Sequence, residues 1–135
     1  MFIKEKKLFN KTVSVFYKKH GRHDLPWRQT TDPYKILVSE IMLQQTQVSR
    51  VLEKYKQFLK AFPTAKRLAQ APQAEVLILW SGLGYNRRAR FLHQCATELL
   101  SYKTFPTEVP VLEKLPGIGH YTARAVATFA FNQPH

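Results

Sequence analysis

The sequence predicts an all-α domain. Apolar residues recur at helical spacing through most of its 135 residues, and no segment shows the sustained period-two alternation of a half-buried strand. Turn and cap signals separate the apolar segments, and there is neither an internal repeat nor a low-complexity segment. A hydrophobic fraction of 44% and an aromatic fraction of 13% are typical of a packed domain, and the length fits one domain.

The first half of the chain predicts three helices. Residues 2–17 carry apolar side chains at amphipathic spacing, and His20-Gly21 ends that helix before a loop over 20–31. Asp32-Pro33 is typical of an N-cap followed by proline in the first turn. The helix that follows is apolar on nearly every side, which predicts a buried central position. Residues 47–62 then predict an amphipathic helix.

The second half predicts two short helices, a long one and a final pair. Pro63-Thr64 and Pro72 each start a short helix, and the second ends at Gly82-Leu83-Gly84. A long amphipathic helix follows, and a connector over 105–110 leads through a short helix to the Pro116–Gly119 turn. The last helix runs from about Tyr121 to Phe131. The inner face of the long helix is expected to comprise Phe91, Leu92, Cys95, Ala96, Leu99 and Leu100.

The charge of the chain is strongly positive. Twenty-one Lys and Arg residues face 9 acidic residues, which gives a formal net charge of +12. Such an excess indicates a polyanionic partner, nucleic acid first of all, although a basic surface that serves only solubility is the alternative. The one cysteine, Cys95, excludes a disulfide framework or a cysteine-held zinc or iron–sulfur cluster within these residues. No segment resembles a signal peptide or a membrane span, so we expect no membrane partner.

The string Leu115 to Ala123 contains a candidate phosphate-binding turn. Gly117 and Gly119 permit a tight turn between helices and expose successive backbone N–H groups at the start of the last helix, where the helix dipole favours an anion. A phosphate held there, with Ile118, His120 and Thr122 beside it, would be bound without reading sequence. An ordinary helical corner with a glycine cap is the alternative.

Two further clusters carry chemistry. Glu40 lies on an apolar stripe with Ile36, Leu37 and Leu43, and burial there would raise its pKa and make it a candidate general acid. From spacing alone, a solvated or Arg-paired glutamate at the rim of the core is equally consistent. Arg87, Arg88 and Arg90 form a basic cluster suited to phosphates, with a solvated helix face as the alternative.

The motifs together resemble a known family. The LPGIGxxTA string is similar to the hairpin of the helix-hairpin-helix superfamily of DNA glycosylases, and LPWR, DPYK, SEIMLQQTQV and LWSGLGY resemble its adenine-specific members. The resemblance runs from about Leu25 to Phe131. It implies a six-helix barrel core over 25–135 with the hairpin at about 107–131. Residues 1–24 would form an N-terminal helix and loop that pack on a downstream half.

The resemblance also implies a substrate and residue roles. Double-stranded DNA with adenine opposite 8-oxoguanine or guanine would be the partner, and Glu40 would protonate the flipped adenine so that it leaves as a neutral base. Gln45 would fill the vacated stack beside Gln44. Trp27, Arg28 and Tyr121 would form the base pocket, with simple core packing as the alternative for Trp27. Leu83 and Tyr85 would enter at the lesion side, or serve only in packing the turn.

The hairpin carries two further implications. Main-chain carbonyls of Glu113, Leu115 and Ile118 would hold a cation that bridges to a phosphate. Endonuclease III, a related glycosylase, has a Schiff-base lysine where this chain has Tyr121, which argues for a hydrolase without strong lyase activity. A lyase of that type and a non-enzymatic DNA-binding module remain the alternatives.

Other family features are expected beyond the chain's end. A second carboxylate in a D-G-N-V-like string, four cysteines for a [4Fe–4S] cluster in the parent protein, and an 8-oxoguanine-recognition domain would follow residue 135. The 135 residues are therefore expected to be a fragment of a catalytic core that binds DNA, has little activity alone and holds no cofactor of its own. We expect a monomer, and an exposed apolar face on the first helix would be a risk for self-association. We also expect an intracellular location, which in a prokaryote would be cytoplasmic and near the nucleoid.

Overall fold

The computed structural model describes residues 25–132, and within that range it is entirely helical. The all-α prediction is confirmed there, whereas the predicted helix over 2–17 and the rest of the 1–24 segment lie outside the described residues. The elements are η1 (Pro26–Arg28), α2 (Pro33–Leu43), α3 (Val48–Ala61), α4 (Ala65–Gln70), α5 (Gln73–Trp80), α6 (Arg87–Leu99), α7 (Val109–Leu112) and α8 (His120–Phe131). In the described range no helix has the length and apolarity needed to cross a membrane.

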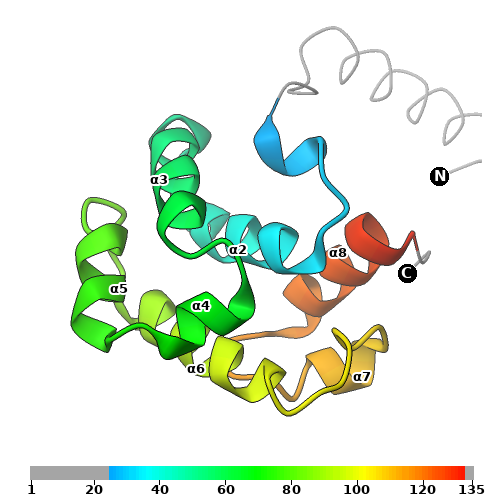
Figure 1. Ribbon diagram of the computed structural model, residues 1–135. Helices are drawn as coiled ribbons and strands as arrows, with labels where there is room; N and C mark the ends of the chain where they lie inside the picture. Colours follow the sequence, from blue (N-terminus) through cyan, green and yellow to red (C-terminus); the bar gives the residue numbers. More distant parts are fainter. Residues whose placement is uncertain (1–24, 133–135) are drawn as a thin grey trace, which may run out of the picture.

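Helix α2 occupies the centre of the domain and packs against α3, α6, α8 and η1 (Figure 1). Its start is fixed by Asp32, whose carboxylate accepts hydrogen bonds from the N–H groups of Tyr34 and Lys35, and by Pro33 in the first turn. Every residue from Ile36 to Met42 is buried, as the apolar sequence predicts. Because this part of α2 is buried, the side chains that it carries have little freedom to move.

The flanking helices bury one face each. In α3, Val51, Tyr55 and Phe58 point inward, and in α6 the buried stripe consists of Leu92, Cys95, Ala96 and Leu99. The expectation that Leu100 joins this stripe is wrong, because it is 48% exposed. Helix α6 ends at Leu99, and Leu100 is the C-cap residue that follows it.

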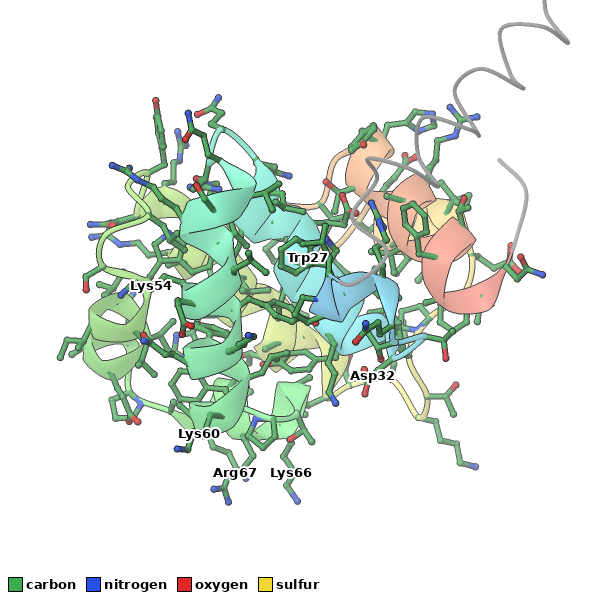
Figure 2. The ribbon with its side chains drawn as sticks, turned by 90° about the horizontal axis from the view of Figure 1, so that it is seen from above. Trp27, Asp32, Lys54, Lys60, Lys66 and Arg67 are labelled. Atoms are coloured by element: carbon green, nitrogen blue, oxygen red, sulfur yellow. The ribbon has the colours of Figure 1, made fainter. Side chains whose placement is uncertain are left out.

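Aromatic contacts join the middle and end of α3 to the rest of the core. Phe58 meets both Phe62 and Trp80 edge to face, with ring centroids 5.1 and 6.1 Å apart. The Tyr34 hydroxyl donates to the Phe62 carbonyl at 2.8 Å, which ties the start of α2 to the end of α3. Trp27, the middle residue of η1, faces α3 and meets Tyr55 edge to face at 5.1 Å (Figure 2).

The short helices complete one side of the core. Thr64 caps α4 by accepting a hydrogen bond from the Arg67 N–H, and α4 and α5 both pack on α6. The two short helices predicted after Pro63 and Pro72 are confirmed. On the opposite side of α2, α8 packs along its length and α7 packs on α8, so the glycine turn that joins α7 to α8 lies at one end of this layer (Figure 1).

Candidate active site and nucleic-acid interface

Glu40 is a buried carboxylic acid on the central helix. Its side chain is only 7% exposed, and no described residue donates a hydrogen bond to its carboxylate. Burial raises its pKa above the ordinary glutamate value, and the positive charge of Arg28 partly offsets that rise. The structure thus gives Glu40 the environment of a proton donor.

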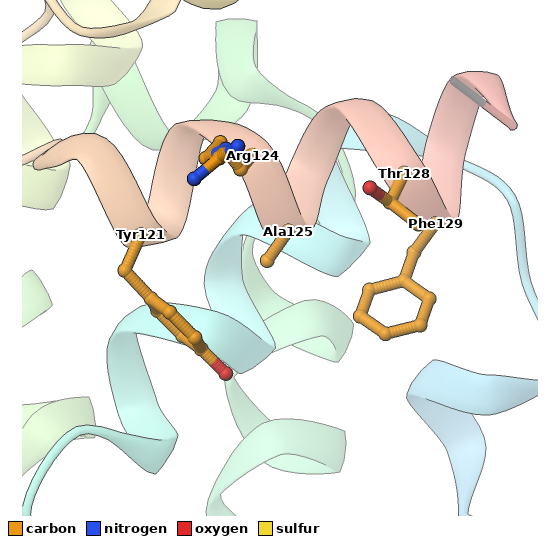
Figure 3. Close-up of a pocket in the computed structure, with 5 residues that line it drawn as sticks. All are labelled: Tyr121, Arg124, Ala125, Thr128 and Phe129. Carbon is orange, nitrogen blue, oxygen red and sulfur yellow. The ribbon is translucent and has the colours of Figure 1, made fainter. Parts of the chain in front are cut away.

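Arg28 connects this acid to a pocket on α8. Its guanidinium lies 4.1 Å from the centroid of the Phe129 ring, so it stacks on that ring while its charge acts on Glu40. The pocket, of about 280 Å³, is lined by Tyr121, Arg124, Ala125, Thr128 and Phe129. Figure 3 shows the rings of Tyr121 and Phe129 projecting from one face of α8 on either side of Ala125. Tyr121 is 77% exposed, which leaves its ring free to meet a ligand.

Trp27, expected beside Arg28 in the pocket, lies in the core instead of at the surface. It is 2% exposed and packs against Tyr55. The core-packing alternative therefore describes its contacts in this structure.

The turn between α2 and α3 presents one of its two glutamines. The Gln44 amide donates to the Thr122 hydroxyl at 3.0 Å and so ties the end of α2 to α8. Gln45 is exposed and adopts a left-handed backbone, with φ of 58°. Thr122 is itself buried, so its side chain serves this contact and does not face solvent as expected for a phosphate ligand.

Arg88 departs most clearly from the sequence expectation. One terminal nitrogen donates to the carbonyls of Ile41 and Met42, at 2.7 and 3.0 Å, and to that of Gln44. The other donates to the Thr46 hydroxyl at 2.9 Å and the Gly84 carbonyl at 3.3 Å. These bonds satisfy the unpaired carbonyls at the C-terminus of α2, where a cation is also favoured by the helix dipole. Arg88 therefore holds two turns together and is not part of a phosphate-facing cluster.

The other two arginines of the cluster do face solvent. Arg87 and Arg90 are exposed on α6, and the Arg87 guanidinium lies over the Phe91 ring at 5.4 Å. Sequence spacing could not separate these residues from Arg88, because the acceptors of Arg88 on α2 and in the turn after it lie more than 40 residues away in the chain.

In the Gly82–Tyr85 turn, one of the two predicted lesion contacts is exposed and the other is buried. Leu83 is 3% exposed, whereas Tyr85 is 63% exposed with a left-handed backbone, φ 52°. The Trp80 indole donates to the Gly84 carbonyl at 3.1 Å, which adds to the bond from Arg88. The turn is firmly held, and of its two predicted lesion contacts only Tyr85 stands at the surface.

The hairpin between α7 and α8 leaves its backbone open. Gly117 has φ of 75°, and a Cβ there would lie 2.6 Å from the Phe91 Cβ, so only glycine fits. A Cβ on Gly119 would meet nothing within 4 Å. The first backbone bond of α8 runs from the Ala123 N–H to the Gly119 carbonyl, so the preceding amides are those that a helix start leaves unpaired. These amides stay a predicted oxyanion site.

Around the hairpin, His120 contacts Glu113, and one of the carbonyls predicted to bind a cation already accepts a hydrogen bond. The His120 Nδ1 contacts a Glu113 carboxylate oxygen, which links the end of α7 to the first residue of α8. The Leu115 carbonyl already accepts from the Ile118 N–H at 3.2 Å. Among residues 25–132 no group of three or more His, Cys, Asp or Glu side chains could hold a metal. The main-chain carbonyls of Glu113, Leu115 and Ile118 thus stay a predicted cation site.

Comparisons with known proteins agree with this geometry. Residues 38–133 match the family described as HhH-GPD superfamily base excision DNA repair protein. The adenine DNA glycosylase of Mycolicibacterium smegmatis is 51% identical over 115 residues, 83% of this chain and 39% of its own length. That of Buchnera aphidicola is 44% identical over 93% of the chain and 36% of its own length. The chain therefore spans between a third and two fifths of these relatives.

Solved structures share the fold. A thermostable thymine-DNA glycosylase superposes with a TM-score of 0.86 at 32% identity, over 96% of this chain and 61% of its own. A non-covalent endonuclease III–DNA complex gives a TM-score of 0.78 at 22% identity, over 99% of this chain and 63% of that one. At that identity the second likeness concerns the fold alone.

Proposed function

Because the chain belongs to the HhH-GPD superfamily of base excision DNA repair proteins, we propose that it forms the helical core of an adenine DNA glycosylase. The substrate would be double-stranded DNA in which adenine is mispaired with 8-oxoguanine or guanine, and the reaction hydrolysis of the N-glycosidic bond. The single observation that carries the proposal is Glu40, a nearly buried carboxylic acid with a raised pKa beside Arg28.

Glu40 would act as general acid. Adenine leaves slowly as an anion, so a proton placed on a ring nitrogen lets the electron pair of the glycosidic bond depart with a neutral base. Water then adds to the sugar, and its proton is lost to solvent. Burial raises the pKa of Glu40 and so favours its protonated form, which is the form that a general acid requires.

The groups beside the acid suit a flipped base. The exposed rings of Tyr121 and Phe129 offer flat apolar surfaces against which a purine can stack, and Arg28 lies at the Phe129 end of this pocket. Gln45, exposed on its turn, would enter the stack from which the base has gone, with Tyr85 beside it. Leu83 would reach DNA only if its turn opened, since it is buried. Trp27 would support the pocket from the core.

The hairpin would hold the DNA backbone. Its open amides at Gly119 and the start of α8 can donate to phosphate oxygens, and the exposed Arg87 and Arg90 add charge on the neighbouring helix. A cation on the hairpin carbonyls would supply one further positive charge toward phosphate. We infer a monomer that acts on chromosomal DNA inside the cell.

Two alternative functions, a lyase and a non-enzymatic DNA-binding module, can each be distinguished from the proposed hydrolase. A lyase of the endonuclease III type needs an amine to attack the sugar, whereas this chain presents a phenol at Tyr121. Trapping with borohydride would yield a covalent DNA adduct only from such an amine. A pure binding module would bind duplex DNA and release no adenine in any context.

A polypeptide of these 135 residues alone is expected to bind DNA and release adenine slowly. Positive charge that develops on the sugar needs a second carboxylate to stabilise it. The one aspartate among residues 25–132 is Asp32, and its carboxylate is engaged as the cap of α2. The buried Cys95, whose pKa burial raises to about 12, offers no cluster ligand either. Any [4Fe–4S] cluster would have to be held by other cysteines.

The decisive experiment places this core in a complete enzyme. In a hybrid, residues 25–131 replace the matching segment of the Mycolicibacterium smegmatis relative, and adenine release opposite 8-oxoguanine is measured with protein in excess. Glu40→Gln should slow release by about 10²–10⁴-fold and leave mismatch binding unchanged. Glu53→Gln, which removes an exposed carboxylate on α3, is the matched control. Undiminished release by Glu40→Gln would show that Glu40 is structural, and no release by the unmutated hybrid would contradict the proposal.

A further inference from the structure

Helix α3 carries two cations next to the exposed turns. Arg50 and Lys54 are four residues apart and so lie on one side of the helix. A Cβ placed on Gly82 would lie 3.5 Å from the Lys54 Cε, which shows that the lysine stem covers the Gly82–Tyr85 turn. Arg50 lines an open, polar pocket of about 300 Å³ together with Gln45, Thr46 and Gln47.

Neither cation has an acidic partner among residues 25–132. Glu53 is exposed on the same helix, but no carboxylate oxygen of the described residues lies within 4.0 Å of the Arg50 or Lys54 nitrogens. Arg88, close by, donates from both terminal nitrogens to groups of the protein. The two α3 cations therefore remain available to an anion from outside the described residues, and a polar pocket lies beside them.

Two hydrogen bonds place these cations relative to the hairpin. On one side of the 44–47 turn, Gln44 bonds to Thr122 in the first turn of α8. On the other side, the Thr46 hydroxyl donates to the Leu83 carbonyl, at 3.4 Å, in the turn that Lys54 covers. Gln45 therefore lies between the hairpin on one side and Arg50 with Lys54 on the other.

We propose that Arg50 and Lys54, with the pocket at Gln45–Gln47, bind backbone phosphates of the DNA strand opposite the flipped base, while the hairpin binds the strand that carries it. The inference rests on the proposed function, because a side chain that enters the base stack stands between two backbones, and cations on its two sides then face different strands. The Arg50 guanidinium can bind a phosphate through two N–H groups, and Lys54 adds a point charge. The hairpin alone would leave the second strand unheld.

The test compares two double variants of equal charge. Arg50→Met/Lys54→Met keeps the apolar stems and removes two charges from the proposed site. Lys60→Met/Lys66→Met removes two charges at the far end of α3 and the start of α4 (Figure 2). Binding of the 135-residue chain to a duplex with adenine opposite 8-oxoguanine is measured against salt. In the first variant we expect the slope of log affinity on log salt to become shallower by about 0.9 for each phosphate that the protein no longer neutralises, and in the second we expect it to be unchanged.

Neutral phosphates identify the strand. Methylphosphonates placed around the mispair, in one strand at a time, should weaken binding of the unmutated chain in both cases. The Arg50→Met/Lys54→Met variant should keep its sensitivity in the adenine strand and become insensitive in the opposite strand. Equal slopes for the two double variants, or insensitivity in the adenine strand, would overturn the strand assignment while leaving the glycosylase proposal intact. If the unmutated chain binds no DNA at any salt, the nucleic-acid interface and this site both fail. Matching thermal melting curves verify that the variants fold.

Discussion

Two ionisable groups on or against α2, the partly buried Arg88 and the buried Glu40, have opposite surroundings. The Arg88 side chain extends from α6. It donates to carbonyls at the end of α2, to the Thr46 hydroxyl in the turn after α2, and to the Gly84 carbonyl in the Gly82–Tyr85 turn. Glu40, in the middle of α2, receives no hydrogen bond from any described residue. Burial acts on both, since it lowers the pKa of the arginine and raises that of the acid. The Arg88 guanidinium is therefore held by hydrogen bonds, whereas the Glu40 carboxyl has no hydrogen-bonded partner among residues 25–132.

The difference separates structure from chemistry. A partly buried charge with hydrogen-bonded partners stabilises the arrangement around it and offers a ligand no free terminal donor. A buried carboxyl without them costs stability in its charged form and gains a function only when a substrate supplies the missing partner. The two groups should therefore respond to mutation in opposite ways.

The largest effect is expected from Arg88. Arg88→Met leaves the carbonyls at the end of α2 without their donor, and a hydrogen bond to a charged group makes a net contribution of about 1.5–3 kcal/mol. We expect the free energy of unfolding to fall by about 2–4 kcal/mol. Chemical denaturation measures this change. Arg87→Met, one residue earlier and exposed, should change stability by less than about 0.5 kcal/mol. Equal effects of the two substitutions would mean that the Arg88 contacts do not stabilise the fold.

The hairpin glycines extend the comparison to backbone groups. Gly117→Ala places a methyl group against Phe91 in a left-handed backbone and should destabilise by about 1–3 kcal/mol. Gly119→Ala meets open space and has φ of −86°, so stability should change little. If phosphate approaches Gly119, however, DNA binding by Gly119→Ala should weaken equally for all sequences. Thermal melting and DNA titration of both variants separate the two effects, and a Gly119→Ala protein that binds DNA normally would place the phosphate elsewhere.

The sequence predicted much of this molecule for identifiable reasons. The start of α2 at Asp32-Pro33 follows from cap chemistry that is read within a few residues. The apolar stripe around Glu40 made its burial one of two equally consistent expectations, and the structure shows it buried. The role of Arg88 could not be predicted, because its neighbours Arg87 and Arg90 look the same in sequence and its acceptors are contributed by α2. The stacking of Arg28 on Phe129 joins residues about 100 positions apart, and no local pattern signals it.

The smallest effect concerns how Glu40 changes stability as a function of pH. Its folded-state pKa is raised, so the folded protein binds this proton more tightly than the unfolded chain does. Below the unfolded pKa, near 4.5, the carboxyl is neutral in both states and costs nothing. As pH rises through the folded pKa, the free energy of unfolding of the unmutated protein must fall relative to that of Glu40→Gln. The variant should therefore be the more stable protein at about pH 8, and the difference should vanish at about pH 4. Thermal melting across this range measures it, with Glu53→Gln as the control for the removal of one negative charge. A Glu40→Gln protein that is less stable at pH 8 would mean that the carboxylate has a partner in the fold, and the contrast with Arg88 would then disappear.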